Sequence, residues 1–285
     1  MTVLKRRFPV VAGSFYPSDP KALRQQIEAC FKHRLGPGEL PRVNSEGGRR
    51  VSALVSPHAG YVYSGPVAAH GYYALAEDGV PETFILLGPN HTGFGSGVSI
   101  MVEGSWRTPL GDLEIDRELA AALVGSCRII DPDESAHRHE HSIEVQLPFI
   151  QYLYGSPKIV PVCFLMQDPE TAREVGETIA KSILGENAVI VASTDLTHYE
   201  PHSEAAAKDR KVIDAVLNLD ASGVAQVVDS LGVSMCGPGP VMAAIAAAKA
   251  LKAERGELLA YATSGDVTGD RSSVVGYASI TLRRA

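Results

Sequence analysis

The side chains best suited to chemistry lie in three short polar segments, each of which follows an apolar run. The segments are Ser56–Tyr61 (SPHAGY), Gly88–Gly93 (GPNHTG) and Ser193–His198 (STDLTH). Each contains one histidine: His58, His91 and His198. Ligands of open α/β sheets bind beyond the carboxyl ends of the strands, and neutral imidazole is the commonest metal ligand in proteins. We therefore expect the three histidines to meet in one cleft; the alternative is that they stabilise turns through hydrogen bonds.

A thiol and a carboxylate could complete this cleft. Cys236 lies in the segment SMCGPGP, directly before an expected helix, and a helix N-terminus favours the thiolate. Two imidazoles with one thiolate or carboxylate would leave coordination positions open, as in a working metal site. The alternative for Cys236 is a small residue packed in a Gly/Pro turn. Asp195 precedes His198 by three residues and is a candidate to orient it.

The tract Asp131–Gln146 (DPDESAHRHEHSIEVQ) holds three histidines at alternate positions. His141 and Glu144 are three residues apart, so on a helix they would share a face and could orient substrate or transfer protons. We expect His137 and His139 on a solvated loop. A separate metal site made of the three alternating histidines is the alternative.

The periodicity predicts strands that alternate with helices. The expected strands are 51–56, 83–88, 97–103, 158–165, 188–193, 257–264 and 273–282. The expected helices are 19–34, 65–78, 116–126, 141–154, 168–184, 202–218, 220–231 and 240–254. Several strands are apolar on nearly every residue, which is typical of strands covered on both faces. The pattern predicts an α/β fold, a single domain over residues 1–285, with a central mostly parallel or mixed sheet flanked by helices.

Composition excludes several classes of protein. The 285 residues include 26 Lys and Arg against 33 Asp and Glu, a net charge of −7, which argues against a nucleic-acid binder. The longest apolar run, Val241–Ala248, is eight residues, against roughly 18 for a membrane span. No CxxC pair occurs, so a disulfide scaffold or zinc ribbon is not expected. We expect a cytoplasmic protein that binds a small molecule or a peptide, without nucleic acid or membrane.

These motifs together resemble the Memo family, which includes the AmmeMemoRadiSam system protein B group. The matching segments are SPHAGYVYSG at 56–65, LLGPNHTG at 86–93, WRTPLGDLEID at 106–116, EHSIEVQLPFI at 140–150, STDLTH at 193–198 and MCGPGP at 235–240. They occur in the family's order and cover nearly the whole chain. The resemblance implies a fold similar to that of class III, LigB-type extradiol dioxygenases, which are non-haem iron enzymes that cleave catechol rings.

The resemblance also implies roles for individual residues. His58, His91 and Cys236 match the family's metal-binding histidines and the cysteine beside them. Asp195 and His198 match further cleft residues, with His198 similar to the dioxygenase acid/base histidine. The remaining expected substrate-binding or supporting residues are His141, Glu144, Asn90 and Tyr61. The dioxygenases use a carboxylate where this chain has a thiol, and thiolate suits copper(I) and zinc as well as iron.

Three functions are compatible with these residues. The first is an oxidoreductase that uses Fe(II) or copper, with zinc as a further possibility, on a small and possibly phenolic substrate. The second is a hydrolase or transferase in which Cys236 is the nucleophile and His58 or His198 the base. The third is a binding module whose cleft holds a peptide or metabolite. Eukaryotic Memo proteins are associated with metal-dependent redox chemistry and with phosphotyrosine-peptide binding.

Overall fold

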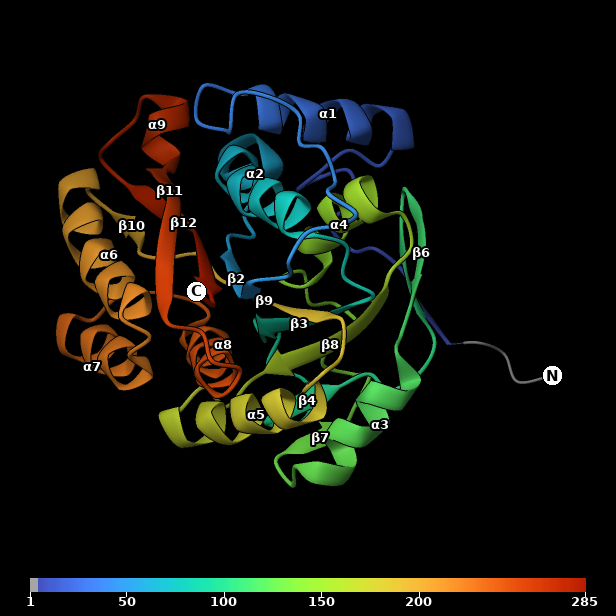
Figure 1. Ribbon diagram of the computed structural model, residues 1–285. Coiled ribbons are helices and arrows are strands. Elements are labelled where there is room, and N and C mark those ends of the chain that lie inside the picture. Colours follow the sequence, from blue (N-terminus) through green and yellow to red (C-terminus); the bar gives the residue numbers. More distant parts are fainter. Residues whose placement is uncertain (1–4) are drawn as a thin grey trace.

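The computed structural model describes residues 5–285, and its central feature is a mixed sheet between two layers of helices (Figure 1). The strand order is β10-β12-β2-β9-β3-β8-β4-β7, with β11 paired to β12. These strands are β2 (Val51–Ser56), β3 (Thr83–Pro89), β4 (Val98–Ile100), β7 (Ile130–Pro132), β8 (Lys158–Phe164), β9 (Ala188–Ser193), β10 (His198–Glu200), β11 (Arg255–Thr263) and β12 (Val274–Arg283). The expected α/β class with a mixed central sheet is confirmed.

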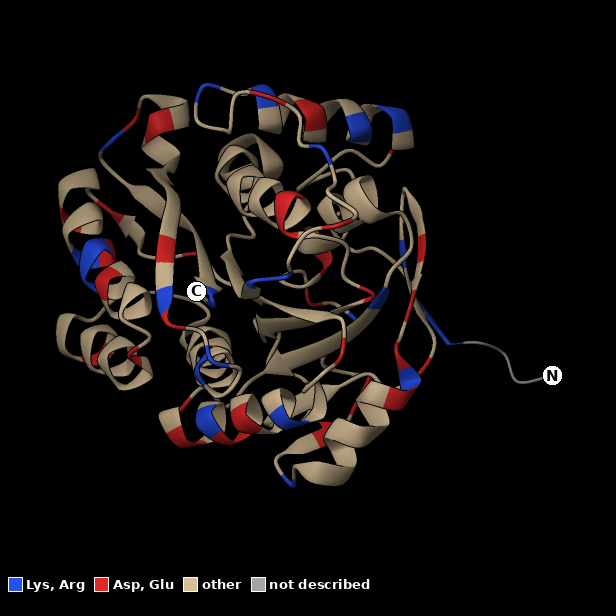
Figure 2. Ribbon diagram, in the orientation of Figure 1, with Lys and Arg blue, Asp and Glu red and all other residues tan. Residues whose placement is uncertain are grey.

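Helices cover both faces of this sheet. They are α1 (Pro20–Lys32), α2 (Tyr61–Asp78), α3 (Arg117–Ser126), α4 (Leu147–Tyr154), α5 (Pro169–Ser182), α6 (His202–Leu217), α7 (Ala221–Leu231), α8 (Pro238–Ala250) and α9 (Ser264–Thr268). Helix α2 packs on β2 and β12 and is backed by α1, whereas α8 packs on β2, β9 and β3 and is backed by α5. Figure 2 shows acidic and basic residues interspersed along α1, α5 and α6.

The four middle strands are parallel, and this fixes where polar segments meet. Strand β2 pairs with β9, β9 with β3, and β3 with β8. Ser56 lies opposite Ser193, so the segments that follow β2 and β9 leave the sheet side by side. All residues of β2 and β3 are buried, because helices cover both faces. The carboxyl ends of these strands therefore bring the polar segments to one edge.

Several details differ from the sequence expectation. A small sheet of β1 (Arg6–Arg7), β5 (Ser105–Thr108) and β6 (Gly111–Glu114) was not predicted. Helix α2 begins at Tyr61 rather than residue 65, so Pro66 lies inside the helix. The expected helix 141–154 begins as a 3₁₀ turn, Glu144–Gln146, before α4. Within residues 5–285, no helix is long and apolar enough to cross a bilayer.

Gly276 in β12 provides space for a buried carboxylate. Asp209 of α6 accepts a hydrogen bond from the Thr197 backbone N–H at 2.9 Å, behind the segment that carries His198. A Cβ atom on Gly276 would lie 1.9 Å from the Asp209 carboxylate. Gly276→Ala is therefore expected to lower the free energy of unfolding by about 1–3 kcal/mol, measured by urea denaturation, because the core would be overpacked.

Gly125, in the last turn of α3, provides the matched control. A Cβ atom there would meet no heavy atom within 4 Å. Gly125→Ala is expected to raise stability by about 0.5–1 kcal/mol, because alanine loses less conformational entropy in a helix. Equal effects of the Gly276 and Gly125 substitutions would contradict the role of Gly276.

Candidate metal centre

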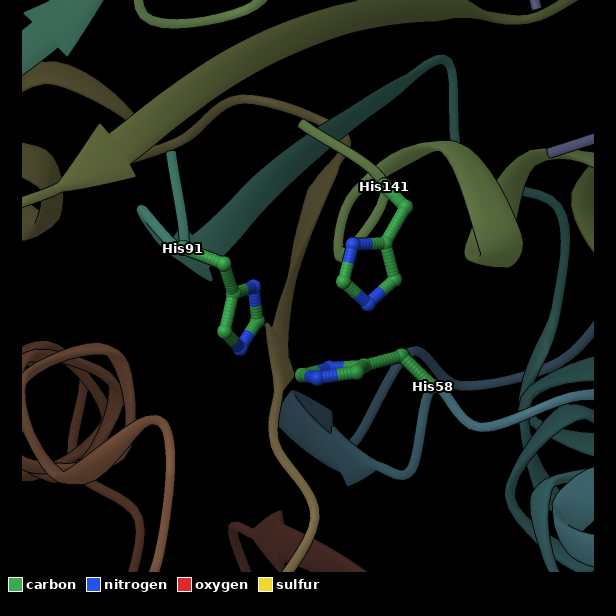
Figure 3. A group of neighbouring side chains, drawn as sticks. All are labelled: His58, His91 and His141. Atoms are coloured by element: carbon green, nitrogen blue, oxygen red, sulfur yellow. The ribbon is translucent and has the colours of Figure 1, made fainter. Parts of the chain in front are cut away.

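Three histidines from distant parts of the chain converge at the carboxyl edge of the sheet. His58 follows β2, His91 follows β3, and His141 precedes the 3₁₀ turn that leads into α4. One ring nitrogen from each lies within 4.8 Å of the others. Figure 3 shows the three rings turned toward one another. His58 is buried, whereas the His91 and His141 side chains are 34% and 24% exposed, so the group is open on one side.

A buried hydroxyl fixes the tautomer of His58. Ser193 Oγ donates to the Ser142 carbonyl at 2.7 Å and accepts from Gln146 Nε2 at 2.8 Å. Its remaining lone pair faces His58 Nδ1 at 2.9 Å, so Nδ1 must carry the proton and donate it. This leaves the lone pair of His58 on Nε2. Burial, with His141 and His91 nearby, holds the pKa of His58 well below its usual value, which keeps the ring neutral.

Glu140 orients the His91 ring and lies beside the His141 ring. Its carboxylate lies 2.9 Å from His91 Nδ1 and 3.4 Å from His141 Nδ1, and it also accepts the Ser142 N–H at 2.8 Å. Burial alone would raise the pKa of Glu140, but the hydrogen bond from His91 and the backbone donors lower it to about 2. A carboxylate behind a histidine fixes the ring and raises its basicity as a ligand. The sequence interpretation did not single out Glu140, although it stands directly before His141.

Removal of the Glu140 charge is expected to weaken metal binding. Glu140→Gln should lower the affinity for Co(II) or Zn(II) by about 10- to 100-fold, because the His91 ring would lose the carboxylate that orients it and the His141 ring would lose a neighbouring negative charge. Competition with a chromophoric chelator measures this affinity. Glu103→Gln is the control, because Glu103 is partly exposed, does not line the histidine pocket and pairs with Arg117. Equal affinities of the two variants would contradict the role of Glu140.

Cys236, expected as the third ligand, lies beside the three histidines. Its Sγ is 3.3 Å from His58 Nε2, and it receives the Asp195 backbone N–H at 3.2 Å. The three ligand atoms that lie within 4.8 Å of one another belong to His58, His91 and His141, so the group includes His141 and does not include Cys236. Burial raises the pKa of the Cys236 thiol to about 12. The thiol therefore lies next to one candidate ligand of the centre and outside the group of three.

Asp195 and His198 line the same pocket but act on different neighbours. The Asp195 carboxylate accepts the His58 backbone N–H at 2.8 Å, and burial raises its pKa to about 6. His198 Nδ1 lies 2.8 Å from the Ser234 carbonyl, so Nδ1 donates and Nε2 keeps the lone pair. The expectation that Asp195 orients His198 is therefore corrected, because Ser234 orients that ring and Asp195 holds the loop of His58.

Three of the residues expected to bind substrate or to support the cleft have polar contacts within the protein. Glu144 is fully buried and forms an ion pair with Arg7, away from the pocket. Tyr61 is also buried, and its hydroxyl donates to the Val145 carbonyl at 2.7 Å. Asn90 shapes the loop that carries His91: its side chain accepts from the Gly93 N–H and donates to a carbonyl four residues on.

The two other histidines of the alternating tract lie outside the centre. His139 is exposed, as expected. His137 is buried, contrary to the expectation of a solvated loop, and its ring packs edge-on against Trp106 at 5.7 Å. The separate metal site from three alternating histidines is therefore wrong, because the three side chains point into different environments.

A pocket of about 580 Å³ opens above the histidines. Its wall contains His58, His91, His141, Asp195, His198 and Cys236, together with the rings of Phe15, Tyr63 and Tyr199. Tyr199 is 77% exposed and has a φ of 60°, a left-handed conformation that a residue other than glycine rarely adopts and that is common at functional sites. The pocket therefore joins a nitrogen-rich floor to a wall with aromatic side chains.

The donor set fits a transition metal. Three neutral imidazoles suit zinc, copper and iron, and three protein ligands leave positions for water or substrate. Ring orientation by Ser193 and Glu140 is the arrangement that metal-ligating histidines require. The centre therefore has the ligands and the surrounding hydrogen bonds for one metal ion.

Comparison with known proteins agrees with this architecture. A MEMO1 family protein of Methanopyrus kandleri is 59% identical over 98% of this chain and 99% of its own, and one of Methanothermobacter thermautotrophicus is 55% identical over 96% and 99%. An uncharacterized protein of Escherichia coli K12 with a solved structure superposes with a TM-score of 0.56 at 16% identity, covering 82% of this chain and 100% of that chain. The family model described as Memo-like protein matches residues 7–281, and the chain belongs to the Memo family.

Proposed function

We propose that this Memo family chain is a metal-dependent oxidoreductase that uses Fe(II) or copper to act on a small phenolic substrate. The single observation that carries the proposal is the convergence of three histidine side chains on the floor of an open pocket. Such a site leaves coordination positions free, as a working metal centre does and a closed structural site does not. When bound, Fe(II) or copper would supply redox chemistry with dioxygen.

The walls of the pocket support a flat phenolic substrate. Phe15, Tyr63 and Tyr199 offer ring faces and edges, which favour aromatic ligands in offset or edge-on contact. His198 keeps its Nε2 lone pair because Nδ1 donates to Ser234, so it can accept the proton of a substrate hydroxyl and return it later. His58 and His91 are held in fixed tautomers and serve as ligands in this account.

A metal-independent cysteine hydrolase agrees less well with the same pocket. A nucleophilic cysteine needs a lowered pKa, whereas burial raises the pKa of Cys236 to about 12. The nearest base to its sulfur is His58 Nε2, at 3.3 Å, and that nitrogen is one of the three in the histidine group. His58 Nε2 cannot bind a metal ion and act as the base for Cys236 at the same time. We therefore assign it as a metal ligand.

An oxygen electrode tests the proposal. Protein loaded anaerobically with one equivalent of Fe(II), and separately with copper, is mixed with oxygenated buffer and a panel of catechols and monophenols. We expect oxygen uptake that depends on both metal and phenol and is lost in His91→Ala. Metal-loaded protein that binds these phenols without consuming oxygen would overturn the proposal and favour a binding function.

A further inference from the structure

A buried arginine near the N-terminus reaches the segment that carries His141. Arg7 is 6% exposed, and its Nε donates to the His137 carbonyl at 3.1 Å while Nη2 donates to the Glu140 carbonyl. Its third nitrogen, Nη1, pairs with the Glu144 carboxylate. The guanidinium also lies over Trp106, 4.5 Å from the ring centroid. One side chain therefore binds the segment 137–144 at three points along its length.

Glu144 in turn holds the stretch Arg7–Tyr16, here called the N-terminal strap. Its carboxylate accepts the backbone N–H groups of Val10 at 2.9 Å and Val11 at 3.1 Å, and the Tyr16 hydroxyl at 2.6 Å. With Arg7, four groups of the strap donate to this one carboxylate. Because the carboxylate is fully buried, each contact acts with little competition from water.

The far end of the strap forms one wall of the histidine pocket. Ser14 and Phe15 line that pocket, and the Phe15 ring lies edge-on to His141 with centroids 5.0 Å apart. The Phe15 carbonyl accepts the backbone N–H of Tyr61 at 2.8 Å, just beyond the loop of His58. The strap therefore spans from Glu144 to the edge of the candidate metal centre.

We propose that the buried Arg7–Glu144 pair is a positioning unit for the metal centre, which holds His141 and Glu140 in ligand geometry and keeps Phe15 against the His141 ring. This proposal rests on the metal site of the proposed function. Neither Arg7 nor Glu144 lines the pocket, so both act through the residues they hold. Contacts outside the ligands commonly change metal affinity by about 10- to 100-fold, because they fix the orientation of the ligand rings.

Co(II) binding tests this role without any need for a substrate. Glu144→Gln removes the charge that pairs with Arg7 and places an N–H₂ group among N–H donors. Arg7→Lys keeps the positive charge but cannot donate to all three acceptors at once. Each variant is expected to bind Co(II) about 10-fold more weakly than the wild type in competition with a chelator, and to show altered visible absorption bands of the bound Co(II).

Asp78→Asn separates positioning from general stability. Asp78 also uses its carboxylate to bind two backbone N–H groups, those of Arg50 at 2.7 Å and Val51 at 2.9 Å, but at the amino end of β2, away from the histidines. This control should lose free energy of unfolding and keep the Co(II) affinity and spectrum of the wild type. Arg7→Lys retains the ion pair, so it provides the test if Glu144→Gln fails to fold.

The outcomes distinguish the two proposals. Weaker Co(II) binding with a changed spectrum in the folded Arg7 and Glu144 variants, but not in Asp78→Asn, supports the positioning role. Wild-type binding in these variants overturns the positioning role and leaves the metal site intact. A wild-type protein that binds no Co(II) overturns the metal site and the positioning role together.

Discussion

Replacement of His141 with alanine is expected to lower the affinity for Fe(II), Co(II) or Zn(II) by at least about 100-fold. His141 supplies one of three converging nitrogens, and loss of a ligand should exceed the 10- to 100-fold typical of a contact behind the ligands. The fold should survive, because the His141 side chain is partly exposed and the residue lies outside the helices and strands. Metal content after anaerobic loading and desalting, with circular dichroism as the check on folding, measures the effect.

His139→Ala is the control for this substitution. His139 lies two residues earlier in the same tract, is exposed and is absent from the histidine pocket, so its replacement should leave metal binding unchanged. A His141→Ala protein that retains one equivalent of metal with wild-type affinity would contradict the assignment of His141. The comparison also decides between His141 and Cys236 as the third ligand, because Cys236→Ala should then retain the metal.

His198→Gln is expected to reduce the turnover of phenols by about 10²- to 10⁴-fold without loss of metal. The ring is held by Ser234 through Nδ1, so Nε2 is the only nitrogen of His198 left to accept a proton. Glutamine retains a polar group at this place but is not a base at neutral pH, and a positioned acid/base typically contributes this factor. Initial rates of oxygen uptake and metal content, measured on the same preparation, provide the two readouts.

A comparison of the loss of turnover with the loss of metal distinguishes a base from a ligand at His198. Equal losses of metal and activity in His198→Gln would show that His198 acts as a ligand and contradict its role as a base. Unchanged oxygen uptake with full metal content would contradict any role of His198 in proton transfer.

The architecture could be predicted because its signals are local. Apolar runs such as 51–56 and 188–193 are typical of strands that helices cover on both faces. The structure places both strands in the middle of the sheet. The small sheet of β1, β5 and β6 was missed, because these strands have two to four residues and each contains charged side chains. Such short strands depend on partners that are distant in the sequence.

The candidate site could be predicted in part for a related reason. His58 and His91 stand directly after parallel strands, so their meeting at one edge follows from the topology. His141 was predicted in the cleft but paired with Glu144, on the assumption of a regular helix from residue 141. The chain there forms a turn and a 3₁₀ helix, and Glu144 points instead to Arg7, which is 137 residues away.

The buried charged residues could not be predicted from the sequence, because their positions depend on long-range contacts. Nothing in the local pattern around Arg7 predicts a buried guanidinium, because arginine is mostly exposed in folded proteins. Glu140 was likewise hidden in a charged tract, although its carboxylate is the acceptor for His91. Buried charges are stable only when paired, so their location is decided by partners that the fold supplies.

Anomalous diffraction at the metal edge, from crystals of protein loaded anaerobically with Fe(II) or Co(II), tests the central claim most directly. The account predicts one strong peak about 2.0–2.2 Å from a ring nitrogen of each of His58, His91 and His141. A peak that lies on Cys236 and leaves His141 unbound, or a loaded crystal with no peak among the three rings, would contradict it.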